Sequence, residues 1–396
     1  MTNNFPTVAR PHDFWRVNSY GYPGFFSDTE KSQEAWSTLL SFFDFSDYEE
    51  LKKYWSSDIP SRKITSHAVE SWKATFEEFG ILYVETRSNL ITITPAGMQL
   101  RDAANSGNET EFAWIGLNLL LRYPLRGPRR PKSEAHRDSD LLLYRFIYAA
   151  LLDLDGYVWW PELERILCRV FWTGDAMSAV QDVKTLRADP SLITRVDLPV
   201  SQRQGAFYNS LNQVAVHAGM NHLLLGRDNV VSPYGVTEPK GKHFIRSEWI
   251  GMIRRALSNN GSSDQCANGG LAIARIAAAP ELISERAYFE YLGAEVTPMS
   301  LANTPTLSSV NLLGEVVFFL TLNDHYMHAA HNEIVGSVAA LCQLAQGQRL
   351  ILSHDEQWTY LVESKVLINA NTVKVHIRRA RPISNISVLQ SLREGA

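Results

Sequence analysis

The hydrophobic pattern is clearest over residues 61–100. Apolar positions recur every three or four residues over 66–79, as on the buried face of a helix. Gly80 supplies a helix stop. Apolar and polar residues then alternate over 81–94 on both sides of a short turn, which is typical of a β-hairpin. Pro95 suits the first turn of a new helix, so the pattern predicts helix, hairpin and helix in succession.

Helical spacing continues along most of the chain, interrupted by glycines, prolines and short alternating segments. The further helices that this spacing predicts are 32–43, 48–55, 97–104, 111–121, 140–154, 162–171, 174–187, 206–218, 247–257, 267–278, 285–292, 312–322 and 333–344. The further strands that the alternation predicts are 219–225, 230–231, 349–353, 358–366 and 372–378.

The helix–hairpin order of 61–100 recurs in looser form between residues 206 and 257. We therefore expect a mainly helical α+β protein with tandem winged-helix-like domains followed by a smaller α/β domain. The polar run at 260–263 marks the clearest boundary. The expected parts are an N-terminal arm with the first winged-helix domain at 1–125, a basic linker at 126–139, a second winged-helix-like domain at 140–260 and a C-terminal α/β domain at 261–396.

Composition narrows the class of protein. The 396 residues carry a formal net charge of −4, so contact with nucleic acid would have to come from local basic patches. Three widely separated cysteines form neither a disulfide framework nor a metal clip. No apolar run approaches the ~20 residues that cross a bilayer, and the N-terminus lacks a signal-peptide core. We therefore expect a cytoplasmic protein without a membrane-spanning segment.

Basic and polar residues gather at three places around the first expected module. These are the exposed face of the helix at 66–79, the hairpin turn and the proline-rich segment 122–137, the densest positive stretch of the chain. Such side chains contact phosphates and base edges, although a solvated interdomain linker would also account for the segment. The candidate DNA-binding residues are Arg62, Lys63, His67, Ser71, Lys73, Arg87, Arg126, Arg129, Arg130 and Lys132.

The N-terminal pattern contains a distinctive set of residues: Trp72, Gly80, Ile91, Thr94, Pro95, Gly97, Tyr123 and Pro124. With these residues it resembles the DNA-recognition regions of some prokaryotic restriction endonucleases, which are built from winged-helix subdomains. The resemblance covers about residues 30–260. It implies duplex DNA as a partner and a place in a restriction or anti-phage defence system.

A second candidate site lies near the C-terminus. Asp355, followed by Glu363 and Lys365, resembles the D…ExK signature of PD-(D/E)xK nucleases. On a strand, Glu363 and Lys365 would project to the same face, and the carboxylates, with Glu333, would hold Mg²⁺ for phosphodiester cleavage. A structural hairpin with solvent-facing charges is the simpler interpretation, because the spacing is short for that family.

Three functions remain open from the sequence. The first is a DNA-binding protein, whose C-terminal part would form a homodimer or bind a partner protein of a defence system. The second is a Mg²⁺-dependent endonuclease with Asp355, Glu363 and Lys365 as catalytic residues and Glu333, Asp355 and Glu363 as metal ligands. The third is a winged-helix scaffold for protein interactions.

Overall fold

The structure is a computed structural model, and it describes part of the chain. The described residues are 5–6, 13–17, 22–27, 30–56, 66–127, 134–198, 204–220, 222–235, 241–259, 272–282, 284–297, 299, 306–312, 315–321, 333–337, 341, 344–352, 355–369 and 372–382.

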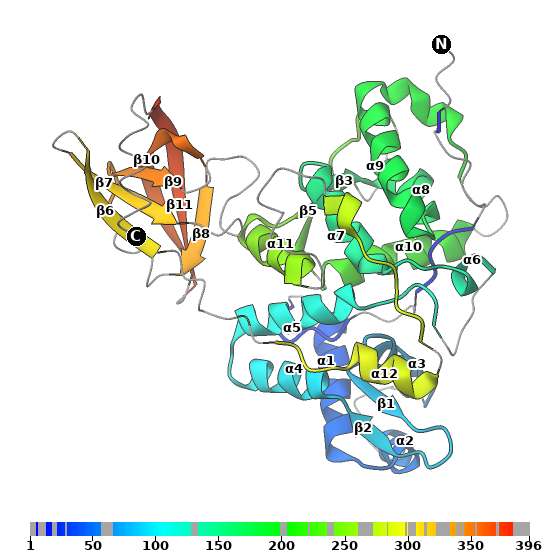
Figure 1. The fold of residues 1–396 in the computed structure, drawn as a ribbon. Coiled ribbons are helices and arrows are strands. Elements are labelled where there is room, and N and C mark those ends of the chain that lie inside the picture. The colour runs from blue at the N-terminus through cyan, green and yellow to red at the C-terminus, as the bar shows by residue number, and fades with distance from the viewer. Residues whose placement is uncertain are drawn as a thin grey trace. The chain divides into compact units, whose positions relative to one another are not determined.

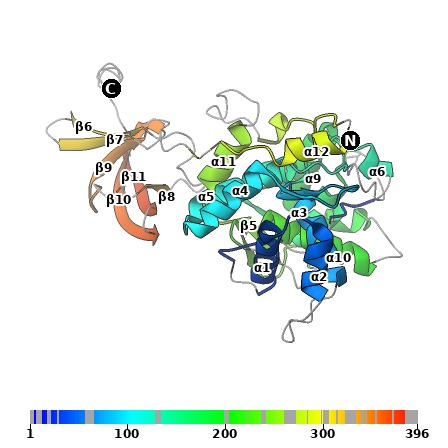
Figure 2. The ribbon, with the colours of Figure 1, turned by 90° about the horizontal axis from the view of Figure 1, so that it is seen from below.

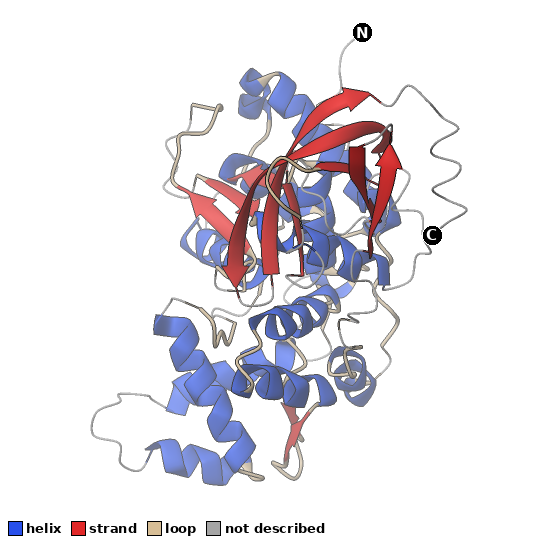
Figure 3. Ribbon diagram, turned by 90° about the vertical axis from the view of Figure 1, so that its left-hand side faces the viewer, coloured by secondary structure: helices blue, strands red, loops and turns tan. Residues whose placement is uncertain are grey.

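The protein is of the α+β class, as expected, and its sheets are largely antiparallel. The chain forms two compact units. Unit 1 comprises residues 1–245 and 271–298, and unit 2 comprises residues 246–270 and 299–396. The described helices belong mainly to unit 1, whereas the longest strands belong to unit 2 (Figure 3).

The bounds of the elements follow most of the predicted ranges closely. Unit 1 contains α1 (Glu30–Asp44), α2 (Tyr48–Ser56), α3 (Ser66–Glu78), β1 (Leu82–Val84), β2 (Ile91–Ile93), α4 (Pro95–Asn105), α5 (Glu109–Leu121), α6 (Glu134–Arg137), α7 (Leu143–Asp153), β3 (Tyr157–Trp159), α8 (Trp160–Arg165), α9 (Thr173–Ala188), α10 (Gln204–Ala218), β4 (Leu225–Asp228), β5 (Lys242–Ile245) and α12 (Glu285–Leu292). Short 3₁₀ helices lie at Leu167–Arg169, Pro190–Arg195 and Ala272–Arg275.

The first helix–hairpin module consists of α1, α2, α3 and the hairpin β1–β2. Between α1 and α2, Asp47 forms an antiparallel bridge with Leu90. The Ile91 N–H donates to the Ser46 carbonyl at 2.9 Å, so this extended stretch lies beside β2. The predicted apolar stripe of α3 is buried at Val69, Trp72 and Phe76, with Phe79 just beyond the helix end.

The second helix–hairpin module consists of α7, β3, α8, α9, α10 and the hairpin β4–β5. Its sheet has the order β3–β5–β4, so the strand after the first helix again pairs with the second strand of the hairpin. The returning strand was expected at Val230 and Val231, but β5 takes that place and both valines lie exposed in the connection. The module thus repeats the order of the first, with one more described helix.

A later segment of the chain, residues 272–297, packs on the first module, although it was predicted to belong to the C-terminal domain at 261–396. Figure 1 shows α12 beside α3 and the β1–β2 hairpin. Figure 2, a view at 90° to the first, also shows α12 next to α3. Phe289 stacks on Tyr83 of the hairpin with ring centroids 5.3 Å apart. Gly80 has a φ of 69°, and a Cβ there would lie 2.5 Å from Leu292 Cβ, so both backbone conformation and packing require glycine.

The same segment also contacts the rest of unit 1. Gln99 exchanges two hydrogen bonds of 2.8 Å with the backbone of Val296. At the start of the segment, the N–H groups of Ala272 and Ile273 donate to the Asp153 carboxylate at the end of α7, each at 2.8 Å. Residues 272–297 therefore contact both modules of unit 1.

Unit 2 contains α11 (Ile250–Asn259), a 3₁₀ turn at Ser247–Trp249 and a six-stranded sheet. The sheet has the order β6–β7–β9–β10–β11–β8, and β7–β9 is its parallel pair. Its described core residues are Ile334, Leu341, Leu344, Leu350, Leu352, Tyr360, Val362, Val373, Val375 and Ile377. Its strands are β6 (Thr306–Leu312), β7 (Glu315–Thr321), β8 (Glu333–Ser337), β9 (Arg349–Leu352), β10 (Asp355–Asn369) and β11 (Thr372–Pro382).

Two predicted helices of the C-terminal region are wrong. Residues 315–321, inside the helix expected at 312–322, form β7, and 333–337 form β8. The reason is physical: a short continuous apolar run has no helical or strand period of its own, and β-branched and aromatic residues such as Val316 to Phe319 favour a strand. None of the described helices is both long and apolar enough to cross a bilayer.

Unit 1 should lose stability as pH rises above about 10. Burial raises the pKa of Tyr22, Tyr144 and Tyr148, and burial followed by the Glu78 carboxylate raises that of Tyr123. Because these phenols keep their protons longer when folded than when unfolded, the free energy of unfolding falls by up to ~1.4 kcal/mol per pH unit for each of them.

An alkaline titration followed by circular dichroism and tyrosinate absorbance checks this expectation. Exposed Tyr54 serves as the control position, since Tyr54→Phe should leave the midpoint unchanged. Tyr148→Phe should move the midpoint to higher pH. Ionisation of all tyrosines near pH 10 in protein that is still folded would contradict it.

Candidate nucleic-acid interface

The helix that precedes the first hairpin, α3, carries three of the candidate DNA-binding residues. Lys73 is partly buried: its Nζ lies 3.4 Å from the Glu77 carboxylate and 5.2 Å from the ring centre of Tyr48. Ser71 is half-buried, and its carbonyl accepts from the Thr75 hydroxyl. His67 lies in the first turn of α3, but its side chain is outside the described part, as are Arg62 and Lys63 altogether.

Glu77 explains why the basic side chain of α3 turns inward. Its Oε1 accepts from the Val84 N–H at 2.9 Å, which fastens α3 to strand β1. The same carboxylate then pairs with Lys73, one helical turn earlier. Glu70 is the exposed charge of this helix, so the described face of α3 is not basic.

The turn of the first hairpin places Arg87 at an exposed position between β1 and β2. Asn89 adopts a φ of 57°, which closes the turn in the left-handed region that asparagine tolerates. One face of the hairpin is covered through Tyr83 by Phe289. The exposed tip at Arg87 is therefore the part of this hairpin best placed to meet another molecule.

The basic linker divides between described and undescribed residues. Arg126 is half-buried and donates from Nη2 to the Pro280 carbonyl at 3.1 Å. Arg122, just before it, donates to the carbonyls of Leu292 and Glu295 at 3.3 and 3.1 Å. These two guanidinium groups therefore bind the backbone of the segment 272–297. Arg129, Arg130 and Lys132 lie outside the described residues.

The helix before the second hairpin, α10, presents amide side chains that were not among the predicted DNA-binding residues. Asn209 is exposed and Asn212 half-buried. Residues three apart in a helix lie on one face. Asparagine amides are suited to the hydrogen-bonding edge of adenine in a major groove. The spacing of the two asparagines was the available signal in the sequence.

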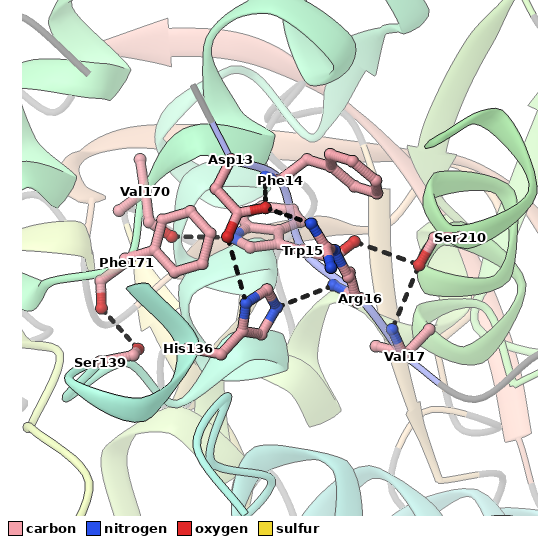
Figure 4. A network of polar contacts seen from close by, with 10 residues as sticks. All are labelled: Asp13, Phe14, Trp15, Arg16, Val17, His136, Ser139, Val170, Phe171 and Ser210. Atoms are coloured by element: carbon pink, nitrogen blue, oxygen red, sulfur yellow. Dashed lines mark hydrogen bonds and ion pairs between the residues drawn. The ribbon is translucent and has the colours of Figure 1, made fainter. Parts of the chain in front are cut away.

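The other face of α10 is held by the N-terminal arm, residues 13–17 (Figure 4). Trp15 is fully buried, and its Nε1 donates to the Val170 carbonyl at 2.7 Å. The Ser210 hydroxyl of α10 donates to the Trp15 carbonyl at 3.1 Å and accepts from the Val17 N–H at 3.2 Å. The Arg16 N–H donates to Nε2 of buried His136 at 3.0 Å. The arm therefore orients α10.

A buried ion pair supports the sheet of the second module. The Glu162 carboxylate has no exposed surface, and Arg187 binds it through Nε at 2.8 Å and Nη2 at 2.9 Å. Glu162 also accepts from the Trp159 N–H at 2.9 Å and from the Tyr234 hydroxyl at 2.5 Å. The sequence signal was a glutamate in the first turn of the helix at Pro161, where a carboxylate commonly caps the N-terminus.

Aromatic rings of the second module's sheet lie beside Arg187 and Lys242. Its guanidinium lies 4.2 Å from the ring centre of Tyr157. Lys242 of β5 lies over the rings of Tyr157, Trp159 and Phe244 at 5.2, 5.8 and 5.8 Å. Lys242 also faces the Asp228 carboxylate at 3.8 Å. The described contacts of Lys242 are thus with side chains of its own sheet.

The C-terminal candidate residues lie on or next to strand β10. Asp355 pairs with Leu352 of β9, and Leu361 pairs with Arg349. Three residues of β9 span about 10 Å, and Glu363 lies about 7 Å beyond Leu361, so Asp355 and Glu363 are roughly 17 Å apart along the sheet. The register does not bring these two residues together.

A bulge separates Glu363 from Lys365 as well. The register passes from Val362 opposite Ile377 to Ser364 opposite His376, so it skips Glu363. Lys365 then stands opposite Val375, on the side of the core residues. The expectation that Glu363 and Lys365 share one face is not met, because the bulge interrupts the alternation.

The register does bring Glu333 near Glu363. Glu333 of β8 stands opposite His376 of β11, which stands opposite Ser364 on its other side. Glu363 is exposed and its Oε1 lies 2.7 Å from Arg378 Nε. The side chains of Glu333 and Asp355 lie outside the described part. Among the side chains that are described, no three His, Cys, Asp or Glu residues form a group that could hold a metal ion.

Comparison with known proteins adds no assignment to this geometry. No protein-family model matches the chain, and no curated protein matches it in sequence.

Proposed function

We propose that the protein binds duplex DNA through the two helix–hairpin modules of unit 1, each of which we interpret as a winged helix. The observation that carries the proposal is the order that both modules share. Each has a helix, one extended stretch, further helices and a hairpin whose second strand pairs with that stretch. In DNA-binding winged helices, the helix before the hairpin enters the major groove and the hairpin lies on the backbone.

The two modules differ in the side chains that they offer. The amide face of α10, with Asn209 and Asn212, suits base edges. The first module offers Arg87 at its hairpin turn, whereas Lys73 is paired within the protein. We therefore assign base reading to α10 and a backbone contact to Arg87, since phosphate contacts position a protein without conveying sequence.

The resemblance of the N-terminal pattern to restriction endonucleases supports a role within a restriction or anti-phage defence system. In such a system the modules would choose the DNA site. Unit 2 would supply a second activity, a homodimer contact or a surface for a partner protein. The basic residues Arg129, Arg130 and Lys132 would add phosphate contacts from the linker.

A second candidate function is Mg²⁺-dependent cleavage of DNA. The observation that favours it is the row formed by Glu333, His376 and the Glu363 bulge on three neighbouring strands. Carboxylate oxygens are preferred Mg²⁺ ligands. Asp355 and Lys365 stand apart from this row, so the nuclease would not use the spacing that the sequence suggested.

Replacing Arg87 with alanine should weaken binding to duplex DNA of any sequence. One lost phosphate contact should lower the slope of log affinity against log salt by about 1. Mobility-shift titrations at several salt concentrations measure both quantities. Asn209→Ala should leave that slope unchanged and reduce the preference between duplexes.

The exposed neighbour Thr86 provides the control, because Thr86→Ala alters the same turn without removing a charge. Adding Mg²⁺ to the same samples and sizing the DNA tests the second candidate function. Unchanged affinity, slope and preference in both Arg87→Ala and Asn209→Ala would remove the modules from DNA recognition.

A further inference from the structure

Strand β11 of unit 2 is the most basic strand of the described chain. Its sequence, TVKVHIRRARP, contains Lys374, Arg378, Arg379 and Arg381 and no acidic residue. The whole protein, by contrast, has a formal net charge of −4. A concentration of positive charge on one strand of an acidic protein calls for an anionic partner.

The two faces of β11 have different roles. Val373, Val375 and Ile377 are buried in the core of unit 2. Because side chains alternate along a strand, Lys374, His376 and Arg378 project from the opposite face. Lys374 and His376 are half-buried there, and Arg378 is 64% exposed. The basic row thus lies outside the core, on a strand whose inner face is fixed by it.

The row is held rigidly and has a regular spacing. β11 pairs with β10 on one edge and with β8 on the other. Successive outward side chains of an antiparallel strand are about 6.8 Å apart. One DNA strand advances about 3.4 Å along its axis per phosphate, so each step of the row spans about two nucleotides.

Both cations have partners within unit 2, which a phosphate would share or replace. Lys374 Nζ donates to the Ser247 hydroxyl at 2.9 Å, and this hydroxyl in turn donates to the Glu248 carboxylate at 3.2 Å. Arg378 Nε meets Glu363 Oε1 at 2.7 Å in a pair whose side chains are 64% and 47% exposed. Exposed pairs of this kind are weak, whereas guanidinium groups bind phosphate through two parallel hydrogen bonds. A phosphate can therefore replace Glu363.

Acidic residues lie next to the row and reduce its positive charge. Glu363 is the described carboxylate on this face, and the register sets Glu333 opposite His376. The backbone register also continues the basic row, since Arg381 stands opposite Thr359, two ladder steps beyond Arg378. Along the backbone of β11, the basic residues therefore continue from Lys374 to Arg381.

We infer that the outer face of β11 is a second DNA contact, in which Lys374 and Arg378 bind phosphates of the backbone without reading sequence. This inference rests on the proposed function, because it assigns to unit 2 a share in holding the DNA that unit 1 recognises. Glu363 acts as a competing carboxylate that occupies Arg378 in the free protein.

Full-length protein with Lys374→Gln and Arg378→Gln together tests the inference. With random-sequence duplex DNA as the probe, affinity at low salt should fall roughly tenfold for each lost contact. The slope against log salt should fall by about 2 in the double variant. Glu363→Gln should have the opposite effect and raise affinity, since it frees Arg378. Glutamine at 374 retains a donor for Ser247, and circular dichroism verifies folding.

The matched control is Arg286→Gln in α12. Arg286 is 85% exposed and forms the same 2.7 Å contact, from Nε to Glu290 Oε1, but it belongs to a helix of unit 1. Its substitution should change neither affinity nor slope. If Arg286→Gln and the β11 variants had equal effects, the weaker binding would follow from the change in net charge alone, and the inference would be overturned.

The outcomes separate this inference from the proposed function. Loss of binding in Arg87→Ala with no change in the β11 variants would overturn the inference alone. A change in the β11 variants with none in Arg87→Ala or Asn209→Ala would sustain it and overturn recognition by the modules. Wild-type protein that binds no duplex would overturn both.

Discussion

Arg187→Met should lower the free energy of unfolding of unit 1 by about 3–5 kcal/mol. Glu162 is completely buried, and two nitrogen atoms of Arg187 bind its carboxylate. Arg187 also donates to the carbonyls of Leu154 and Tyr157 at 2.9 and 2.8 Å. Its removal leaves a buried negative charge and two backbone acceptors without these donors. Methionine retains the length of the side chain, so the loss measured is mainly electrostatic.

A double-mutant cycle with Glu162→Gln isolates this pair. Urea unfolding of the four proteins, followed by circular dichroism, gives the free energies. We expect Glu162→Gln to recover much of the loss caused by Arg187→Met, since no charge then stays buried alone. Additive losses would contradict the role of the pair. The exposed Arg286–Glu290 pair is the control, and Arg286→Met should cause no measurable change.

Trp15→Ala should cost about 3–5 kcal/mol, which is typical of a large aromatic residue removed from a core. Trp15 is fully buried, packs edge-on against Phe146 at 5.7 Å and donates to the Val170 carbonyl. The truncation leaves a cavity and an unsatisfied carbonyl together. Because the arm also holds Ser210 of α10, the variant should bind DNA less tightly even where it is folded.

Urea unfolding of Trp15→Ala and Trp15→Phe measures this loss. Phenylalanine fills much of the space but lacks the indole N–H, so its cost should be intermediate. Tyr54→Ala, at an exposed position of α2, is the control for aromatic truncation. A Trp15→Ala protein as stable as the wild type would show that the arm does not anchor the second module.

The helical pattern was a good guide wherever one stripe of the helix is buried. The stripe of α3 is buried as its spacing predicted, and Thr94 caps α4 just before Pro95. The mainly helical α+β class is confirmed for the same reason. The winged-helix identity of the modules stays a proposal, since packing residues specify a fold more than an activity.

The candidate sites were less predictable because they depend on contacts between distant residues. The spacing of Lys73 in α3 suggested an exposed cation, but a hydrogen bond from Val84 fixes Glu77 beside it. The bulge at Glu363 moves Lys365 to the other face, and no periodicity in the sequence announces a bulge. The pairing of Glu162 with Arg187 links residues on different helices and likewise leaves no local pattern.

The segment 272–297 has a consequence for how the protein is made. Domains usually fold in order as the chain leaves the ribosome, the N-terminal one first. Here Phe289 and Leu292 cover the hairpin and Gly80, so the first module cannot bury this surface until they have been synthesised. By then α11, which belongs to unit 2, has already been translated. Unit 1 can therefore complete its folding only after the first part of unit 2 has been made, and a chain truncated at the polar run after α11 would leave this apolar surface of the first module exposed.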